Sequence, residues 1–353
     1  MDRINQAIRS IQPPDKRIMD LTQERLDSLT KPLGSLGRLE ELAKVIAGIT
    51  GKVAPELKQK VIFTFAADHG VSEEGVSAFP KEVTAQMVYN FLRGGAGINV
   101  IARHVGAKVV VADLGVASDL DTSERLISKK INYGTKNIAK GAAMTKEEAI
   151  NSIIAGIEIF NQEFENGVDI IGTGEMGIAN TTASSAITAV FTAKAVEEIT
   201  GYGTGIDEKS FLNKVRIIKK AIEINKPDPS SAMDVLAKVG GYEIGGIAGV
   251  ILAAAAKRVP VVIDGFNSGA AALIAFGLQP KTKQYMIASH CSVEKGHRVI
   301  LDYIGLKPLF DFNLRLGEGT GAALGINLCE ASVKILNQMA TFKDAKVSNK
   351  DKL

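Results

Sequence analysis

The sequence predicts an α/β fold with a doubly wound, mostly parallel sheet, and three observations lead to this prediction. Short apolar runs alternate with longer segments whose apolar residues fall at helical spacing. The short runs lack the polar alternation of half-exposed strands, which is typical of parallel strands covered on both faces. The chain of 353 residues is long enough for one large domain and a smaller subdomain.

The first part of the chain is expected to be helical, and strands follow it. Apolar residues recur at helical spacing from Leu39 to Ile49, and Gly51 is the expected C-cap. A turn-rich stretch precedes this helix at 31–38. Strands are then expected at the apolar runs 61–67, 108–112, 168–171, 261–263 and 284–288, with 309–312 as a further candidate.

Further helices are expected between and after these strands. Thr145 and Glu148 form a capping box that opens a helix through Phe160. Helices rich in small residues are expected at 241–256 and 268–276. The last helix, 320–339, is expected to pack with the N-terminal helices.

Composition narrows the partners and the location. The 42 Lys and Arg residues nearly balance 39 Asp and Glu, giving a net charge of +3. No basic run interleaved with aromatic residues is present, so no nucleic acid partner is expected. Two cysteines, Cys291 and Cys329, give no disulfide framework and suit a reducing compartment, the cytoplasm. The N-terminus has no hydrophobic signal core and the most apolar window, 244–256, is too short to span a bilayer, so no membrane association is expected.

The loops after the expected strands are the candidates for a binding site, because open α/β sheets bind ligands beyond the carboxyl ends of their strands. These loops are 68–70, 172–177, 264–269 and 289–292, and a fifth glycine-rich loop, 317–321, opens the last helix.

One of these loops matches the G-x-G-x-x-G pattern of dinucleotide-binding proteins, at 172–177. An NAD-dependent dehydrogenase is therefore one hypothesis. It is weakened because the expected second strand ending in an acid is replaced by a helical pattern around Glu197, and because Glu175 would lie beside the pyrophosphate. Two alternatives remain for this segment: it binds a single phosphate at the helix N-terminus, or it is a tight turn without a ligand.

Glu318 lies between two glycines just before the last helix. An acid at a helix N-terminus complements the helix dipole by about 0.3–1 kcal/mol, which is the structural explanation. The flanking glycines favour a functional role more, because they allow a substrate to approach the carboxylate.

Metal and cofactor motifs are not found. The four histidines, His69, His104, His290 and His297, show no zinc-binding spacing, and no phosphate-binding P-loop is present. No metal and no cofactor are therefore expected. Carboxylates and anion-binding loops without a metal suit displacement at a sugar carbon whose leaving group is a cationic pyridinium, since this departs as a neutral base.

Together the loops resemble those of the nicotinate-nucleotide–dimethylbenzimidazole phosphoribosyltransferase family, which makes the lower-ligand nucleoside of cobalamin. The resemblance spans nearly the whole chain, in order. One departure is Ala179, where glycine is expected in the family. The resembling segments are KPLGSLGR at 31–38, ADHG at 67–70, GVSAFP at 75–80, Val83-Thr84, Gln86-Met87, NFLRGG at 90–95, GEMGIANTT at 174–182, DGFNS at 264–268 and RLGEGTG at 315–321.

This resemblance implies a Rossmann-like large domain, 55–300, and a small helical domain built from both chain termini, 1–54 and 301–353. It also implies a homodimer with sites near the subunit interface. By the family's pattern Glu318 is the general base, Glu175 lies near the reacting centre and Lys214 contacts a ligand. The acceptor pocket would contain Ser77, Phe79, Pro80, Gln86 and Met87. The other implied substrate-binding residues are Gly174, Met176, Gly177, Ile178, Asn180, Asp264, Gly265, Phe266, Asn267, Ser268, Ser289, Arg315 and Leu316.

The implied substrates are nicotinate mononucleotide and 5,6-dimethylbenzimidazole. One azole nitrogen would attack C1′ with inversion while Glu318 accepts the proton from the other nitrogen, a step that typically contributes about 10²–10⁴-fold. A nearby Glu175 is expected to raise the pKa of Glu318. A non-catalytic azole or nucleotide carrier is a third hypothesis, which the presence of both glutamates disfavours. Adenine or a substituted phenol could replace dimethylbenzimidazole as the acceptor.

Overall fold

A computed structural model describes residues 1–348 and contains one six-stranded sheet in which every strand pair is parallel. The strand order is β3-β2-β1-β4-β5-β6, so the order reverses between β1 and β4, as in dinucleotide-binding folds. The predicted doubly wound, Rossmann-like sheet is therefore confirmed. The strands are β1 (Lys60–Ala67), β2 (Lys108–Gly115), β3 (Leu126–Ser128), β4 (Ile170–Met176), β5 (Val261–Ile263) and β6 (Met286–Ala288).

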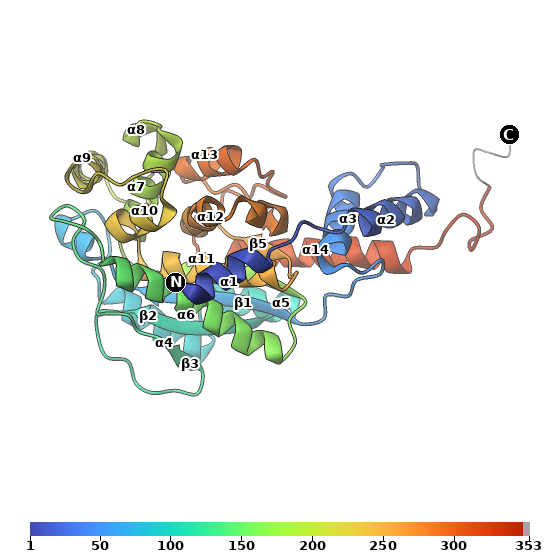
Figure 1. Ribbon diagram of the computed structural model, residues 1–353, viewed down its shortest axis with the longest axis horizontal. Coiled ribbons are helices and arrows are strands. Elements are labelled where there is room, and N and C mark those ends of the chain that lie inside the picture. The colour runs from blue at the N-terminus through green and yellow to red at the C-terminus, as the bar shows by residue number, and fades with distance from the viewer. Residues whose placement is uncertain (349–353) are drawn as a thin grey trace.

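Helices cover both faces of this sheet (Figure 1). Alternate residues of β1 point into two separate cores: Phe63 and Phe65 into one, Ile62 and Ala66 into the other. This two-sided burial explains the continuous apolar runs in the sequence. The helices are α1 (Asp2–Ser10), α2 (Lys16–Ser28), α3 (Arg38–Thr50), α4 (Val83–Arg93), α5 (Gly97–Val105), α6 (Lys146–Glu165), α7 (Asn180–Thr192), α8 (Val196–Ile199), α9 (Glu208–Asn225), α10 (Ala232–Val239), α11 (Tyr242–Ala256), α12 (Phe266–Leu278), α13 (Lys295–Ile304) and α14 (Thr320–Gln338), with 3-10 helices at Gly70–Glu74 and Pro280–Tyr285.

The predicted helices are present, with local signals that work as expected. Gly51 ends α3 in the left-handed conformation, with φ 70°. The Glu148 amide donates to the Thr145 hydroxyl at 3.1 Å and the Thr145 amide to the Glu148 carboxylate at 2.7 Å, so the capping box of α6 is confirmed. The glycines of α11 allow it to pack closely on α6, because a Cβ at Gly249 would clash with the carbonyl of Ile153.

Two expectations about the strands are wrong, and one strand was not predicted. The segment 172–177 is largely strand rather than loop, because β4 continues to Met176. Its glycines make room for the chain beside it: a Cβ at Gly174 would clash with the carbonyl of Glu318. The candidate strand 309–312 makes only an isolated bridge, between Phe310 and His290. The short edge strand β3, which pairs with β2, has no apolar run long enough to predict it.

Part of the helical structure protrudes from one end of the molecule (Figure 1). Helices α2, α3 and the far half of α14 pack together there through a small core that includes Leu26, Ala43 and Leu336. The predicted packing of the last helix with N-terminal helices is therefore confirmed. Helix α1 packs instead on α11 and α6. The division into 55–300 and the two terminal segments stays a prediction, and residues 349–353 of its last segment lie outside the described residues.

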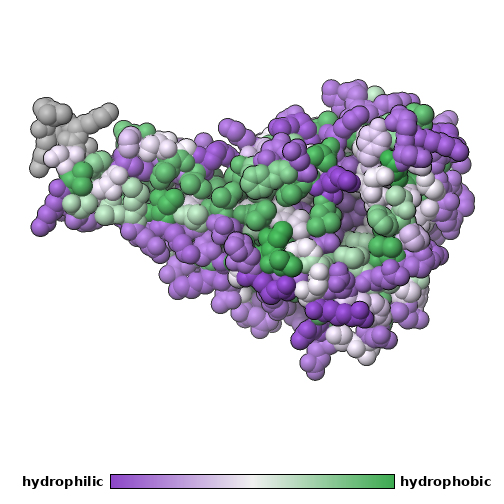
Figure 2. Space-filling model, turned by 180° about the vertical axis from the view of Figure 1, so that it is seen from behind, coloured by the Kyte–Doolittle hydropathy of each residue, from purple (hydrophilic) through white to green (hydrophobic). Residues whose placement is uncertain are grey.

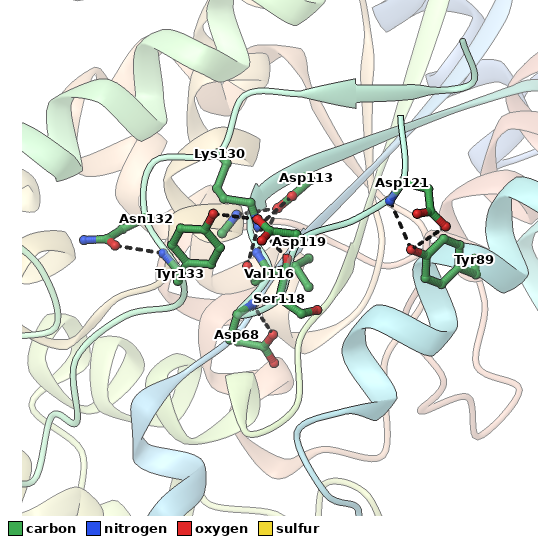
Figure 3. Close-up of polar contacts among 12 residues, drawn as sticks. Asp68, Tyr89, Asp113, Val116, Ser118, Asp119, Asp121, Lys130, Asn132 and Tyr133 are labelled. Atoms are coloured by element: carbon green, nitrogen blue, oxygen red, sulfur yellow. Dashed lines mark hydrogen bonds and ion pairs between the residues drawn. The ribbon is translucent and has the colours of Figure 1, made fainter. Parts of the chain in front are cut away.

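The long connection after β2 is held against the carboxyl ends of β1 and β2 by polar contacts (Figure 3). The Lys130 ammonium lies 2.9 Å from the Asp113 carboxylate and donates to the Ser118 carbonyl at 3.0 Å. The Asp68 carboxylate accepts from the Ala117 amide at 2.7 Å. These contacts hold the connection beside the ends of β1 and β2.

Candidate active site

A cavity of about 510 Å³ opens at the carboxyl ends of β4, β5 and β6, beside the point where the strand order reverses. This is the position where open α/β sheets bind ligands, and the volume suits a small molecule. The walls combine apolar side chains with several groups that can donate hydrogen bonds. They are formed by Phe79, Glu175, Met176, Gly177, Ile178, Asn180, Thr181, Gly203, Thr204, Gly265, Phe266, Asn267, His290, Ser292, Glu294, Asn313, Leu314, Arg315, Leu316 and Gly317.

The loop that carries Glu318 has an unusual backbone. Gly317, Glu318 and Gly319 have φ values of 81°, 63° and 100°, and a non-glycine residue in this left-handed region costs about 1–3 kcal/mol. Several contacts hold the loop in place. The Thr64 hydroxyl donates to the Glu318 carbonyl at 2.9 Å, and the carboxylate of Asp264 accepts from the Gly319 amide at 3.1 Å.

Asp264, rather than Glu318, caps the last helix. Its second carboxylate oxygen accepts from the amide of Ala322, in the first turn of α14, at 3.0 Å. The simple structural explanation for Glu318, an acid serving its own helix, therefore does not describe this carboxylate. Burial raises the pKa of Asp264 to about 7, although the backbone amides lower it.

The Glu318 carboxylate instead points to the start of a different helix, α5. Its Oε2 accepts from the Ile98 amide at 3.0 Å, and Gly97 leaves room for it. Burial raises the pKa of Glu318, and the hydrogen bond from Ile98 opposes this. Neither cause involves Glu175, so the expected effect of Glu175 on this pKa is not found. A buried carboxylate of raised pKa is a stronger base than an exposed one.

Glu175 lines the cavity, at the end of β4 and beside Gly317. Glu294 is the other carboxyl group of the lining, whereas Glu318, the residue after Gly317, adjoins the lining without being part of it. Burial raises its pKa to about 8, with Glu243 and Asp264 raising it further, while Asn267 and Asn180 lower it. The side-chain amide of Asn180 donates to the Glu175 carboxyl group, and the side-chain amide of Asn267 donates to Oδ1 of Asn180 at 3.0 Å. At neutral pH Glu175 is therefore mainly protonated.

A buried carboxyl group in the cavity wall, a second one on the adjoining Glu318 loop, a helix N-terminus and several hydroxyl groups suit group transfer from an anionic sugar derivative. Comparison with known proteins then identifies the family. Residues 11–347 match a family model described as Phosphoribosyltransferase. Relatives from Desulforudis audaxviator (57% identical, covering 99% of both chains) and Geobacter sulfurreducens (56% identical, covering 99% of this chain and 100% of the relative) are both named nicotinate-nucleotide–dimethylbenzimidazole phosphoribosyltransferase.

The chain belongs to this family. CobT from Thermus thermophilus has a similar structure, with a TM-score of 0.91 and 42% identity over 94% of this chain and 99% of that one. The chain is thus a phosphoribosyltransferase, and the dehydrogenase hypothesis is wrong. The physical reason is that the G-x-G-x-x-G segment lies mostly within β4, with Glu175 in the middle of it, and does not form the turn that cradles a pyrophosphate.

Most of the residues predicted to bind the phosphoribosyl group of this enzyme line the cavity, but four lie behind its wall. Gly174 packs on the Glu318 backbone and Asp264 caps α14. Ser268 is buried, and the Ser289 hydroxyl donates to the Ile263 carbonyl at 2.7 Å. The residues that line the cavity as predicted are Glu175, Met176, Gly177, Ile178, Asn180, Gly265, Phe266, Asn267, Arg315 and Leu316.

Lys214 of the phosphoribosyltransferase lies behind the wall as well. Its buried ammonium donates to the Thr181 hydroxyl at 2.7 Å, and Thr181 faces the cavity from the first turn of α7. Burial lowers the pKa of Lys214 to about 8, while Glu294 raises it. Lys214 therefore contacts Thr181, which lines the cavity, and is not part of the wall itself.

Only Phe79 of the predicted acceptor segment reaches the cavity wall. Ser77 lies 3.3 Å from the Thr204 hydroxyl at the cavity edge. Pro80 and Gln86 are exposed, and Met87 is half-buried on α4. The structure thus places these four residues beside the cavity rather than in its wall.

Several cavity residues escaped the sequence analysis: Thr181, Gly203, Thr204, His290, Ser292, Glu294, Asn313, Leu314 and Gly317. A signal existed for four of them. Thr181 and Gly317 lie in the segments 174–182 and 317–321, and His290 and Ser292 lie in the candidate loop 289–292. In that last loop the prediction named Ser289, but alternation along an extended chain turns Ser289 away from the face that His290 occupies.

Two global properties bear on the chemistry. Within residues 1–348, no helix is long and apolar enough to cross a membrane. In the same part of the chain, no three His, Cys, Asp or Glu side chains are grouped so that they could hold a metal ion.

Proposed function

We propose that this phosphoribosyltransferase transfers the phosphoribosyl group of nicotinate mononucleotide to 5,6-dimethylbenzimidazole, giving α-ribazole 5′-phosphate and nicotinate with inversion at C1′. The names of the relatives support both substrates. The observation that carries the mechanism is the pair of carboxyl groups on either side of Gly317, one anchored at the α5 N-terminus and one at the cavity wall.

Glu318 is the general base. One of its oxygens is engaged by the Ile98 amide, which leaves the other free to accept the azole proton. The azole nitrogen attacks C1′ while the bond between C1′ and the pyridinium nitrogen breaks. The electrons of the broken bond stay on that nitrogen and cancel its positive charge as nicotinate leaves. Transfer of the azole proton to Glu318 prevents a positive charge from remaining on the product.

Glu175 acts on the ribosyl centre. Burial keeps it mainly protonated at neutral pH, and a cationic pyridinium nucleotide beside it would lower its pKa and favour the carboxylate. The carboxylate would then stabilise the positive charge that develops on the ribose as nicotinate leaves.

The phosphate group binds at the opposite wall, where donors gather. Arg315 supplies a positive charge, and its guanidinium donates to the Gly203 carbonyl at 3.2 Å. Thr181, held by Lys214, contributes a hydroxyl at the start of α7, where amide groups favour anions. Thr204 adds a further hydroxyl to the same wall, whereas the Ser292 hydroxyl donates its hydrogen to the Leu314 carbonyl at 3.0 Å.

The decisive experiment mixes the protein with nicotinate mononucleotide and dimethylbenzimidazole and follows both free nicotinate and α-ribazole 5′-phosphate by chromatography. Formation of both products in equal amounts is expected. Binding of both compounds without turnover would instead support the carrier hypothesis. Replacement of dimethylbenzimidazole by adenine or a phenol in the same assay determines the preferred acceptor.

A homodimer in the cytoplasm completes the proposal. Exposed apolar side chains, including Leu33, Phe312 and Leu316, offer a surface for a second copy, and apolar residues gather along the protruding helices in Figure 2. The small residues of α11 do not supply this surface, because they are buried within the chain. Sedimentation should give twice the mass of one chain, and an active monomer would contradict the dimer.

A further inference from the structure

His290 is a cavity residue to which the proposed mechanism gives no task. It follows β6 and is nearly buried, with 3% of its surface exposed. Its ring stacks on Phe310 at a centroid distance of 5.8 Å and packs edge-on against His297. These contacts hold the ring in one orientation at the cavity wall.

The neighbouring serine determines which ring nitrogen carries the proton. The Ser289 hydroxyl has one hydrogen and donates it to the Ile263 carbonyl at 2.7 Å. The same oxygen lies 3.0 Å from Nδ1 of His290, so it must accept at this second contact. Nδ1 therefore carries the hydrogen, and Nε2 presents a lone pair.

The ring edge formed by Cε1 and Nε2 lies beside Gly265 in the cavity wall. A Cβ at Gly265 would lie 3.6 Å from both of these atoms and 3.9 Å from the Cβ of Ser292, and all three residues line the cavity. Since Gly265 has no side chain, no side chain of that residue covers this edge of the ring. The ring is also neutral at physiological pH, because burial lowers the pKa of His290 to about 4, although Asp311 opposes this.

A neutral acceptor on the wall selects for a donor on the ligand. The phosphate and carboxylate of nicotinate mononucleotide are mainly acceptors at neutral pH, and the pyridinium nitrogen carries no hydrogen. The only strong donors of this nucleotide are its two ribose hydroxyls. The proton of the azole is already assigned to Glu318.

We infer that Nε2 of His290 accepts a hydrogen bond from a ribose hydroxyl of the bound nucleotide, so that His290 is a substrate-positioning and specificity-determining residue. This inference rests on the proposed function for the identity of the ligand. The contact orients the sugar ring between Glu175 and the phosphate-binding wall, and it selects ribonucleotides over deoxyribonucleotides.

Two substitutions test the contributions of Nδ1 and Nε2 of His290 separately. In His290→Asn the amide group can still donate to the Ser289 hydroxyl, but no atom replaces Nε2. In His290→Gln the longer side chain can present an acceptor near the position of Nε2, but the contact with Ser289 is lost. Each variant is compared with the wild type for binding by calorimetry and for kcat/KM, using nicotinate mononucleotide and its 2′-deoxy and 3′-deoxy analogues.

In the wild type, one of the two deoxy analogues should bind about 2- to 12-fold more weakly than the nucleotide, the usual range for one neutral hydrogen bond. In His290→Asn this ratio should fall to about one at the same position, and His290→Gln should restore part of it. An unchanged ratio in His290→Asn at both positions would overturn the inference. A second result would also overturn it. If a His290 variant loses part of the affinity difference between the nucleotide and nicotinate riboside, which has no phosphate, then His290 contacts the phosphate instead.

The same data keep this inference apart from the proposed function. Wild-type protein that binds the nucleotide and discriminates against one deoxy analogue, but releases no nicotinate, refutes the transferase and retains the hydroxyl contact. Turnover with equal use of all three nucleotides refutes only the contact. A protein that binds none of them overturns both.

Discussion

Replacement of Glu318 by Gln tests the general base with little change in shape. The carboxylate has two oxygens, and one of them accepts from the Ile98 amide at 3.0 Å. The amide of Gln has only one acceptor oxygen, so if that oxygen stays on Ile98 the azole meets an NH₂ group instead of an acceptor. It also cannot accept a proton. Loss of general-base catalysis is expected to lower kcat about 10²–10⁴-fold, equivalent to about 2.7–5.5 kcal/mol.

The Michaelis constants should separate the two substrates. The KM for dimethylbenzimidazole should rise several-fold because one hydrogen bond is lost, and the KM for the nucleotide should stay within about twofold. The raised pKa of Glu318 adds a pH signature. The base works only when ionised, so kcat should fall as pH decreases through a value above the ordinary pKa of Glu, and this limb should be absent from the variant.

Glu330→Gln is the matched control, because it makes the same change in the helix that follows the Glu318 loop, at a partly exposed side chain that pairs with Lys60 and Lys334. It should retain wild-type kcat. Steady-state assays with both substrates and thermal unfolding of both variants give the comparison. A Glu318→Gln enzyme that folds normally and keeps kcat within about threefold of the wild type would refute the assignment of the base.

Three further predictions concern Glu175, the absence of a metal requirement and the turn at Ala179. Nucleotide binding at pH 7 should release close to one proton, because Glu175 with a pKa of about 8 ionises beside the pyridinium. Calorimetry in buffers of different ionisation enthalpy measures this release. An equal release by the Glu175→Gln variant would contradict the prediction. Turnover should persist in EDTA, and loss of activity that a divalent cation restores would disprove metal-free transfer. Ala179 has φ 74°, so Ala179→Gly should be nearly neutral in urea unfolding: relief of about 1–2 kcal/mol of strain offsets the lost methyl group and the added chain entropy. Ala183→Gly, inside α7, should cost about 2 kcal/mol, and an equal cost at both positions would rule out strain at Ala179.

The sequence was sufficient to predict five of the six strands and several of the helices, because these elements rest on local patterns. The capping box at Thr145 and the glycine cap at Gly51 involve neighbouring residues, so their signals are complete within a few positions. The apolar runs of β1 and β5 are continuous because helices cover both faces of the sheet. The glycines around Glu318 marked it as a candidate, and the family resemblance added the expected roles of Glu318 and Glu175.

What could not be predicted depends on contacts between distant segments. Gly174 lies in β4 because the Glu318 backbone packs against it, and nothing near Gly174 in the sequence announces that neighbour. Asp264 serves the N-terminus of α14 rather than the cavity, which only the tertiary structure reveals. The wall formed by Thr204 and Ser292 comes from loops whose composition is ordinary, so no local pattern separates them from other turns.

Helix α14 begins at the Glu318 loop, crosses the sheet and ends among the protruding helices (Figure 1). Because it is a continuous rod, each added or removed residue would rotate one half against the other by about 100°. Such a change would turn either the core-facing side at Ile326 or the bundle-facing side at Leu336 toward water. The length of this helix is therefore under a stricter constraint than its composition: substitutions along it can be accommodated one at a time, whereas an insertion or deletion would uncouple the catalytic loop from the bundle.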